Sequence, residues 1–255
     1  MKLYLKKKVK IINYLINPIS MQDLIKFIFH YQNRNKPISV CISNVHSCIE
    51  SFLNKKFKIA HNTSDIAVAD GKPIYWILKI LNLKNIDHLP GYKVTEEICK
   101  MSIKKNYRIG FYGSKTKILN LLNKKLKKKF KGLKIVYNYA PPFRSLTDKE
   151  EKIIINNINQ SKLDILFICL GCPKQELWMY RNKRKLRCKM LGIGAAVDFL
   201  SGNKVLPNKF FENMGLAWLI RLLSEPKRLL WRYLKSNSLF IILILLQLTG
   251  IKKFK

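Results

Sequence analysis

Three polar side chains of different chemistry follow the end of one apolar run. The run covers Ile165–Leu170, Gly171 interrupts it, and Lys174, Gln175 and Glu176 come shortly afterwards. A short apolar run followed by a glycine turn predicts a buried strand that leads into a helix. Backbone N–H groups at a helix start attract polar ligands, so a cation, an amide and a carboxylate there can recognise one. The alternative for the glutamate is that it only caps its own helix.

Three arginines near the C-terminal end could hold a diphosphate. Arg221, Arg228 and Arg232 are separated by seven and four residues, which would place them on one side of a continuous helix. Pro226 interrupts that continuity, so a shared helix face is predicted above all for Arg228 and Arg232, which both follow it. Planar guanidinium groups bind phosphate oxygens in pairs, which suits a pyrophosphate. The alternative is a basic stripe that faces solvent or lipid.

Polar side chains also follow other apolar runs. Asn44 and His46 follow one such run, Asp70 ends another, and Asp198 follows a third. The carboxyl ends of parallel strands meet at one edge of a sheet, so these side chains are candidates to touch a ligand. The alternatives are structural, namely helix caps and, at the aspartate before Gly71, a tight turn.

The elements that must position these side chains alternate between strand and helix. This order predicts an α/β fold with a Rossmann-like, mostly parallel sheet and helices on both faces. The predicted strands are 38–42, 66–70, 108–112, 134–137, 165–170 and 189–193, and the helices between them include 20–31, 73–81 and 95–104.

The C-terminal region departs from this alternation. A helix at 216–223 ends at Glu225-Pro226, a second helix starts there, and an apolar run covers 239–249 between basic flanks. That run is shorter than the roughly 20 residues of an ordinary membrane span, so it predicts an interfacial segment, with a buried core helix as the alternative. We divide the chain into a basic, variable lead-in (1–17), an α/β core domain (18–208) and a helical appendage with an apolar membrane-contacting tail (209–255).

The composition is strongly basic. The 255 residues carry a formal net charge of +34, and Lys far outnumbers Arg. Such a charge is compatible with nucleic acid, with an anionic membrane surface, or with a coding bias without functional content. Six cysteines are scattered, and Cys169 and Cys172 have no second pair or His cluster to complete a zinc site, which indicates a reducing compartment. No signal peptide is predicted.

Together these motifs resemble the bacterial WecG/TagA/CpsF glycosyltransferase family (family 26), from about Val40 to Phe240. The blocks that carry the resemblance are Asn44-Val-His46, Ala69-Asp-Gly71, Pro90-Gly91, Asp164–Trp178, Gly192–Phe199, Gly215–Arg221, Glu225-Pro-x-Arg228 and Arg232-Tyr233.

The resemblance implies an inverting, metal-independent and cofactor-free transfer. A sugar, N-acetylmannosamine or a related hexose, would pass from a UDP-sugar to a polyprenyl-diphosphate-linked saccharide at the cytoplasmic face of the plasma membrane, in surface polysaccharide or teichoic-acid-type biosynthesis. Asp70 takes the position of the catalytic base, Asn44 that of a substrate-pocket residue, and Gln175 lies in the nucleotide-sugar region. The three arginines match those that hold the UDP diphosphate. The remaining pocket residues would be His46, His88, Gly171, Lys174, Glu176 and Asp198.

Elementary chemistry agrees with that implication. Inversion needs one carboxylate to take the proton of the attacking hydroxyl, and positive charge on the departing diphosphate. No Asp-x-Asp motif occurs in the chain, so arginines would replace a metal ion.

Three positions depart from the family pattern. Ile42 stands where members often have Thr, His88 where they usually have Arg, and Val205-Leu206-Pro207 shortens an Arg-Ala-Pro block. Each departure removes a polar group that could hold sugar or phosphate, so the donor sugar is left open. Two other functions stay open as well, an inactive scaffold of the same fold and a basic nucleic-acid-binding protein, and so does a homo-oligomer.

Overall fold

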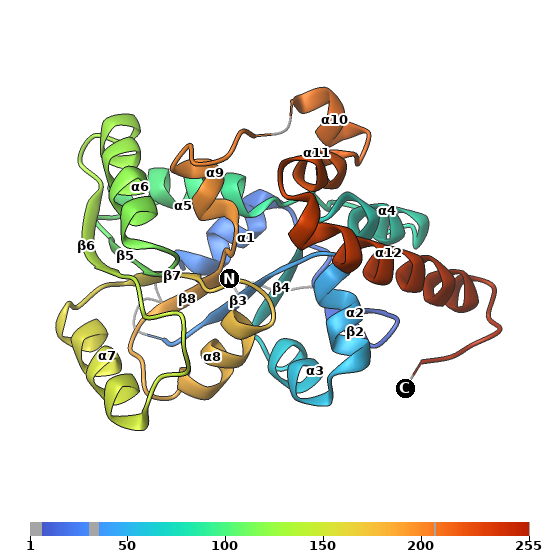
Figure 1. The fold of residues 1–255 in the computed structure, drawn as a ribbon, viewed down its shortest axis with the longest axis horizontal. Helices are drawn as coiled ribbons and strands as arrows, with labels where there is room; N and C mark the ends of the chain where they lie inside the picture. Colours follow the sequence, from blue (N-terminus) through green and yellow to red (C-terminus); the bar gives the residue numbers. More distant parts are fainter. Residues whose placement is uncertain (1–6, 31–35, 207, 255) are drawn as a thin grey trace.

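The computed structural model describes residues 7–30, 36–206 and 208–254. Its centre is a six-stranded sheet with the order β4-β3-β8-β7-β5-β6, in which the five strand pairs are all parallel (Figure 1). The predicted α/β class and the mostly parallel, Rossmann-like sheet are therefore confirmed. The strands are β3 (Ser39–Ser43), β4 (Ile66–Ala69), β5 (Arg108–Gly113), β6 (Lys134–Tyr139), β7 (Ile165–Cys169) and β8 (Lys189–Gly192).

Helices cover both faces of this sheet. Successive side chains of a strand point to opposite faces, so Phe167 and its neighbour Leu166 belong to two separate cores. The Phe167 core packs under α1 (Met21–Ile28), α5 (Gly91–Lys104), α6 (Thr116–Lys129) and α9 (Ala196–Leu200). The Leu166 core packs under α2 (Val45–Leu53), α3 (Lys55–Asn62), α4 (Lys72–Ile80), α7 (Asp148–Gln160) and α8 (Lys174–Asn182).

Element boundaries differ from the sequence-based ones by a few residues. The helix predicted at 95–104 begins at Gly91, and the one predicted at 20–31 ends at Ile28, with residue 31 outside the described ranges. The chain also turns sharply after β8, where Gly194 has a φ of +48°. These boundaries matter because they bring Gly91 and Gly194 to the carboxyl edge of the sheet.

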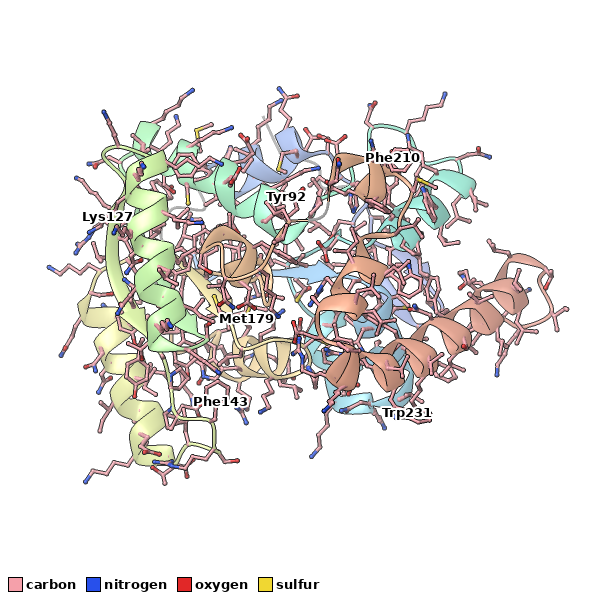
Figure 2. The ribbon with its side chains drawn as sticks, turned by 45° about the horizontal axis from the view of Figure 1, so that its top comes forward. Tyr92, Lys127, Phe143, Met179, Phe210 and Trp231 are labelled. Atoms are coloured by element: carbon pink, nitrogen blue, oxygen red, sulfur yellow. The ribbon has the colours of Figure 1, made fainter. Side chains whose placement is uncertain are left out.

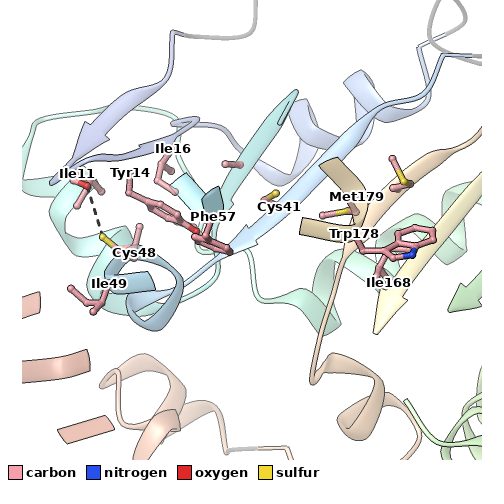
Figure 3. Close-up of a cluster of buried hydrophobic side chains, with 14 of the residues drawn as sticks. Ile11, Tyr14, Ile16, Cys41, Cys48, Ile49, Phe57, Ile168, Trp178 and Met179 are labelled. Carbon is pink, nitrogen blue, oxygen red and sulfur yellow. Dashed lines mark hydrogen bonds between the residues drawn. The ribbon is translucent and has the colours of Figure 1, made fainter. Parts of the chain in front are cut away.

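The predicted lead-in requires a correction. Its residues form an antiparallel hairpin of β1 (Val9–Ile11) and β2 (Tyr14–Ile16), and the side chains of Ile11, Tyr14 and Ile16 are fully buried. Figure 3 shows Tyr14 and Ile16 beside Phe57 of α3, and Ile11 beside Cys48 of α2. Because their burial removes apolar surface from water, this hairpin belongs to the folded core. Residues 1–6 lie outside the described ranges, and the remaining domain boundaries stay a prediction.

Three helices form the C-terminal region. They are α10 (Lys209–Asn213), α11 (Ala217–Ser224) and α12 (Pro226–Leu248). The helical conformation is interrupted between the last two at Glu225, whose φ is −141°. The predicted apolar run at 239–249 is thus the second half of a longer helix. Among the described residues, α12 is the one helix that is long and apolar enough to cross a membrane, although helices of soluble cores pass the same criteria.

One face of α12 packs on the core, along α2. The buried residues of that face are Leu229, Ser236, Phe240, Leu243 and Ile244. At the far end of the helix, the Gln247 side chain accepts a hydrogen bond from the N–H of Ile12 and donates one to the carbonyl of Lys10 at 3.1 Å. The C-terminal helix is therefore held by both α2 and the N-terminal hairpin.

Candidate active site

Asp70 lies partly buried at the carboxyl end of β4, against the start of α5. Its Oδ1 accepts a hydrogen bond from the backbone N–H of Gly91 at 3.0 Å, and its own backbone N–H donates to the Ser43 carbonyl at 2.8 Å. Burial raises the pKa of Asp70, although the charges and donors around it, Arg221 among them, oppose the increase. The hydrogen bond from Gly91 fixes one oxygen of the Asp70 carboxylate. Because its pKa is raised above the ordinary value of an aspartate, this carboxylate is a stronger base than an exposed one.

Asn44 caps α2 and faces Asp70 at the same time. Its Oδ1 accepts the backbone N–H of Ser47 at 3.1 Å, while the Ser47 Oγ accepts the backbone N–H of Asn44 at 2.9 Å. This reciprocal capping box satisfies two N–H groups of the helix start. The Asn44 side chain also lies close enough to Asp70 to lower the pKa of its carboxyl group, and the backbone of Asn44 lies against Gly71, the residue after Asp70. The cap interpretation of Asn44 is therefore confirmed, and its role as a substrate-pocket residue stays a prediction.

A buried layer beneath these residues was missed by sequence reasoning. The Tyr14 hydroxyl donates to the Ser47 Oγ at 2.8 Å, and the Tyr14 ring stacks on His61 with ring centroids 3.7 Å apart. The Nε2 of His61 lies 3.0 Å from the Ser43 Oγ, and burial lowers the pKa of His61 to about 3. The Asn-x-x-Ser spacing could have signalled the Ser47 cap, whereas Tyr14 is 33 residues away from its partner and carried no signal.

His88 bridges Asp70 and the C-terminal region. Its Nε2–H donates to the backbone carbonyl of Asp70, and its Nδ1 lies 3.7 Å from an oxygen of Glu212 on α10. Glu212 also accepts hydrogen bonds from the Tyr92 hydroxyl at 2.9 Å and from the Lys93 Nζ at 2.8 Å. Figure 2 shows Tyr92 at the end of α5 that faces α10. Burial lowers the pKa of His88, while the nearby carboxylates oppose the decrease, and both ring nitrogens already face protein groups.

The Lys-Gln-Glu triplet occupies the first turn of α8, as predicted, but only its lysine is exposed. The Gln175 Nε2 donates to the Glu176 Oε1 at 2.9 Å and to the Gly192 carbonyl at 3.2 Å. Burial raises the pKa of Glu176 to about 7. Gln175 also lies against Gly194, where an added Cβ would sit 3.4 Å from its Oε1. Gln175 and Glu176 therefore tie the start of α8 to the end of β8, and Lys174 is left facing outward.

Two of the three arginines turn toward the edge of the core. The Arg221 guanidinium lies 5.8 Å from the centre of the Phe199 ring and interacts electrostatically with Asp70. The Arg232 Nη2 donates to the Cys172 carbonyl at 3.3 Å, in the turn after β7. The third, Arg228, pairs with Glu225 and is more than half exposed. Two separated cations thus reach the site from the C-terminal helices.

His46 lies where α2 meets α12. Its Nδ1 is 3.3 Å from the Ser236 Oγ of α12. Burial, assisted by the charge of Arg232, lowers the pKa of His46 to about 4, so the ring is neutral at neutral pH. A neutral imidazole between two helices can accept or donate a hydrogen bond without adding charge.

Asp198 lies on α9 and is occupied by neighbours. It accepts a hydrogen bond from the Asn203 Nδ2 at 3.0 Å, and Lys204 lies 3.8 Å from its other oxygen. Lys204 also pairs with Glu225, so Asp198 is connected to the break between α11 and α12. Its predicted contact with a ligand stays a prediction.

Most of the predicted residues therefore fall into three groups, and Lys174, Asp198 and Arg228 belong to none of them. Asn44, Asp70, His88 and Arg221 lie together at the ends of β3 and β4. His46 and Arg232 meet near the turn that contains Gly171, whose φ is +77°. Gln175 and Glu176 form the third group beside β8.

Within the part of the chain that the structure describes, no group of three or more His, Cys, Asp or Glu side chains could hold a metal ion. That the reaction needs no metal stays a prediction.

Comparison with known proteins identifies similar chains over nearly the whole length. The family model described as "Glycosyl transferase WecG/TagA/CpsF family" matches residues 9–253. A protein of Bacillus spizizenii named N-acetylglucosaminyldiphosphoundecaprenol N-acetyl-beta-D-mannosaminyltransferase is 24% identical over 237 residues, which is 90% of each chain. A protein of the same name from Staphylococcus aureus is 22% identical over 238 residues, 93% of this chain and 91% of that one.

Proposed function

The chain belongs to the WecG/TagA/CpsF glycosyl transferase family, and from this premise we propose that it moves an N-acetylmannosamine-type sugar from a UDP-sugar to a polyprenyl-diphosphate-linked saccharide. The names of the relatives support the sugar and the lipid-linked acceptor. The observation that carries the mechanism is the placement of Asp70 beside Asn44, with a cation from α11 nearby.

The proposed step is a single displacement. The carboxylate of Asp70 takes the proton of the acceptor hydroxyl as that oxygen bonds to the anomeric carbon of the donor. The bond from the anomeric carbon to the diphosphate breaks on the opposite face, so the configuration inverts and UDP leaves with the bonding electron pair. Arg221 and Arg232, with Arg228 beside them, stabilise the negative charge that grows on the diphosphate. The acceptor proton ends on Asp70 and is released to water.

The nucleotide side of the pocket is assigned to the start of α8. A Cβ added to Gly171, after β7, would meet no atom within 4 Å, and Lys174 is exposed on the helix that follows. Backbone N–H groups at a helix start favour an anionic ligand, which suits a diphosphate between α8 and the arginines. Contacts of His46, Gln175, Glu176 and Asp198 with substrate belong to this proposal.

Membrane contact is the second part of the proposal. Five apolar side chains of α12, each more than half exposed, lie on the face opposite the buried one. They are Trp231, Leu234, Ile241, Ile242 and Leu245. With about 3.6 residues per turn they fall within an arc of about 100° along most of the helix. Such a stripe, with lysines beside it, fits the headgroup region of an anionic bilayer, where a polyprenyl-linked acceptor resides. We place the enzyme at the cytoplasmic face of the plasma membrane.

Replacing Asp70 with Asn tests the proposed base. The amide keeps the shape and the hydrogen bond from Gly91 but cannot take a proton, so transfer should fall by at least 1,000-fold, roughly 4 kcal/mol of barrier. Binding of the UDP-sugar, measured by calorimetry, should change less than threefold. The assay follows UDP release from a panel of UDP-sugars and short-chain polyprenyl-diphosphate sugars, with no divalent metal added. Unchanged turnover by the Asn variant would remove Asp70 from the mechanism.

A further inference from the structure

A buried carboxylate holds the C-terminal helices against the edge of the sheet. The Glu212 side chain is only 8% exposed, and it receives the Tyr92 hydroxyl, the Lys93 ammonium and, at a longer distance, the His88 ring. All three partners lie on the core, whereas Glu212 lies on α10. Exposed ion pairs contribute little to stability, but a buried carboxylate that loses its partners is strongly unfavourable. This contact therefore favours one placement of α10 over all others.

A glycine on the same segment makes a second contact. Gly215, between α10 and α11, has a φ of +74°, and a Cβ added to it would lie 2.4 Å from the Cη2 atom of Trp76 on α4. Only glycine lets the backbone approach the indole ring this closely. Glu212 and Gly215 thus attach one short segment to α5 and to α4 at the same time.

We propose that Glu212 and Gly215 dock the C-terminal helices onto this edge, and that Glu212, acting through His88, is a positioning residue for Asp70. The second half rests on the proposed function, in which Asp70 is the base. His88 carries the effect because it contacts the Asp70 carbonyl with one nitrogen and faces Glu212 with the other. Placement of the C-terminal helices and placement of the base then depend on one another.

The same docking brings Arg221 to the site. Arg221 lies on α11, directly after the docked segment, and its charge reaches Asp70 from there. If the segment separates from α4 and α5, both the base and one cation of the leaving-group site lose their positions. Glu212 should therefore affect both kcat and the KM for the UDP-sugar, although it touches neither substrate.

Hydrogen exchange of the full-length protein tests the docking without any assay of activity. In Glu212→Gln, the amides of Lys209–Ser224 should exchange at least tenfold faster, because the charge that holds Lys93 is gone. The matched control is Glu97→Gln, the same change on the more exposed side of α5, where Glu97 forms an ion pair with Lys100. Unchanged exchange of α10 and α11 in the Glu212→Gln protein would overturn the docking.

The glycine contact has its own pair of variants. Gly215→Ala adds a methyl group against Trp76, whereas Gly250→Ala adds one at the same kind of backbone angle, φ +75°, with no atom within 4 Å. Both variants carry the backbone strain, so only the difference between them reports the contact. Faster exchange of α10 and α11 in the first variant alone supports the docking, and equal exchange in both contradicts it.

A double-mutant cycle tests the action through His88. Glu212→Gln should lower kcat at least tenfold and raise the KM for the UDP-sugar. In a His88→Phe background the same change should lower kcat less than threefold further, while the KM still rises. Multiplicative losses of kcat would show that Glu212 does not act through His88. A protein with no transferase activity would overturn the proposed function, but the exchange comparisons would still decide the docking.

Discussion

At the scale of single residues, the structure brings together side chains that the sequence could name but could not connect. Asp70 and Asn44 were predictable because each follows an apolar strand and so reaches the carboxyl edge of the sheet. Glu212 was not predictable, because its partner Lys93 is 119 residues away and a glutamate on a short helix looks like any solvated one. The spacing of nearby residues predicts strand ends and helix caps. Contacts between residues that are far apart in the sequence cannot be predicted until the fold is known.

Glu176 gives a residue-scale prediction about stability. Its pKa is raised by burial from the ordinary 4.5 to about 7, so the folded protein binds this proton more tightly than the unfolded chain. The stabilisation is complete below about pH 4.5 and is lost as the pH rises through 7, a change of about 3 kcal/mol. Glu176→Gln removes this titration, because an amide resembles the protonated acid.

The measurement compares urea unfolding of the wild-type and Glu176→Gln proteins at several pH values. The difference in the free energy of unfolding should be small near pH 5 and should favour the Gln variant by about 3 kcal/mol at pH 8. Effects of all other groups cancel in this difference. A difference that is independent of pH would mean that Glu176 is charged in the folded state throughout the range.

At the scale of elements, the strands of the sheet and the start of each long C-terminal helix were predicted well, and the N-terminal hairpin was not. Apolar runs such as Ile165–Cys169 are buried on both faces and are easily recognised. The strands of the N-terminal hairpin have only three residues each, and lysine and asparagine interrupt them, so no periodic pattern appears. Their burial depends on packing against α2 and α3, and that packing cannot be read from the pattern of residues 9–16 alone.

The exposed stripe of α12 gives the element-scale prediction. The double variant Trp231→Asp with Ile242→Asp should lower binding to anionic vesicles at least tenfold, because two apolar side chains no longer enter the headgroup region. Figure 2 shows Trp231 on the outer side of this helix. Thermal unfolding should change little, since both side chains are more than half exposed.

The matched control is Ser238→Asp, which adds a charge to the same exposed face without removing an apolar group. Vesicle sedimentation measures the binding of each protein. If the control loses as much binding as the double variant, charge rather than apolar contact explains the effect. If neither protein loses binding, α12 is not the membrane-contacting element.

At the scale of the whole molecule, the net charge of +34 and the family membership must be read together. The charge alone is compatible with binding to nucleic acid, with binding to an anionic membrane surface, or with a coding bias. Membership in the family favours the membrane surface, where a lipid-linked substrate would lie. Charge distributed over a whole chain attracts such a surface from a distance but does not choose an orientation. The stripe on α12 would supply the orientation.

The salt dependence of vesicle binding tests whether the net charge attracts the protein to an anionic surface. Binding to vesicles that contain anionic lipid should weaken markedly between about 0.1 M and 1 M salt, as the screening length falls from about 10 Å to about 3 Å. Vesicles of neutral lipid should bind weakly at either concentration. Tighter binding to duplex DNA than to anionic vesicles, at equal phosphate concentration, would instead support the nucleic-acid-binding alternative.

The bonds between Gln247 and the N-terminal hairpin have a consequence for biosynthesis. A ribosome makes Gln247 235 residues after Ile12 and 237 residues after Lys10, so this partner of the hairpin is made only after the whole sheet. Nascent chains halted before α12 would leave the apolar flank of α2 open to chaperones. We therefore expect the hairpin to gain these bonds only once α12 has left the exit tunnel.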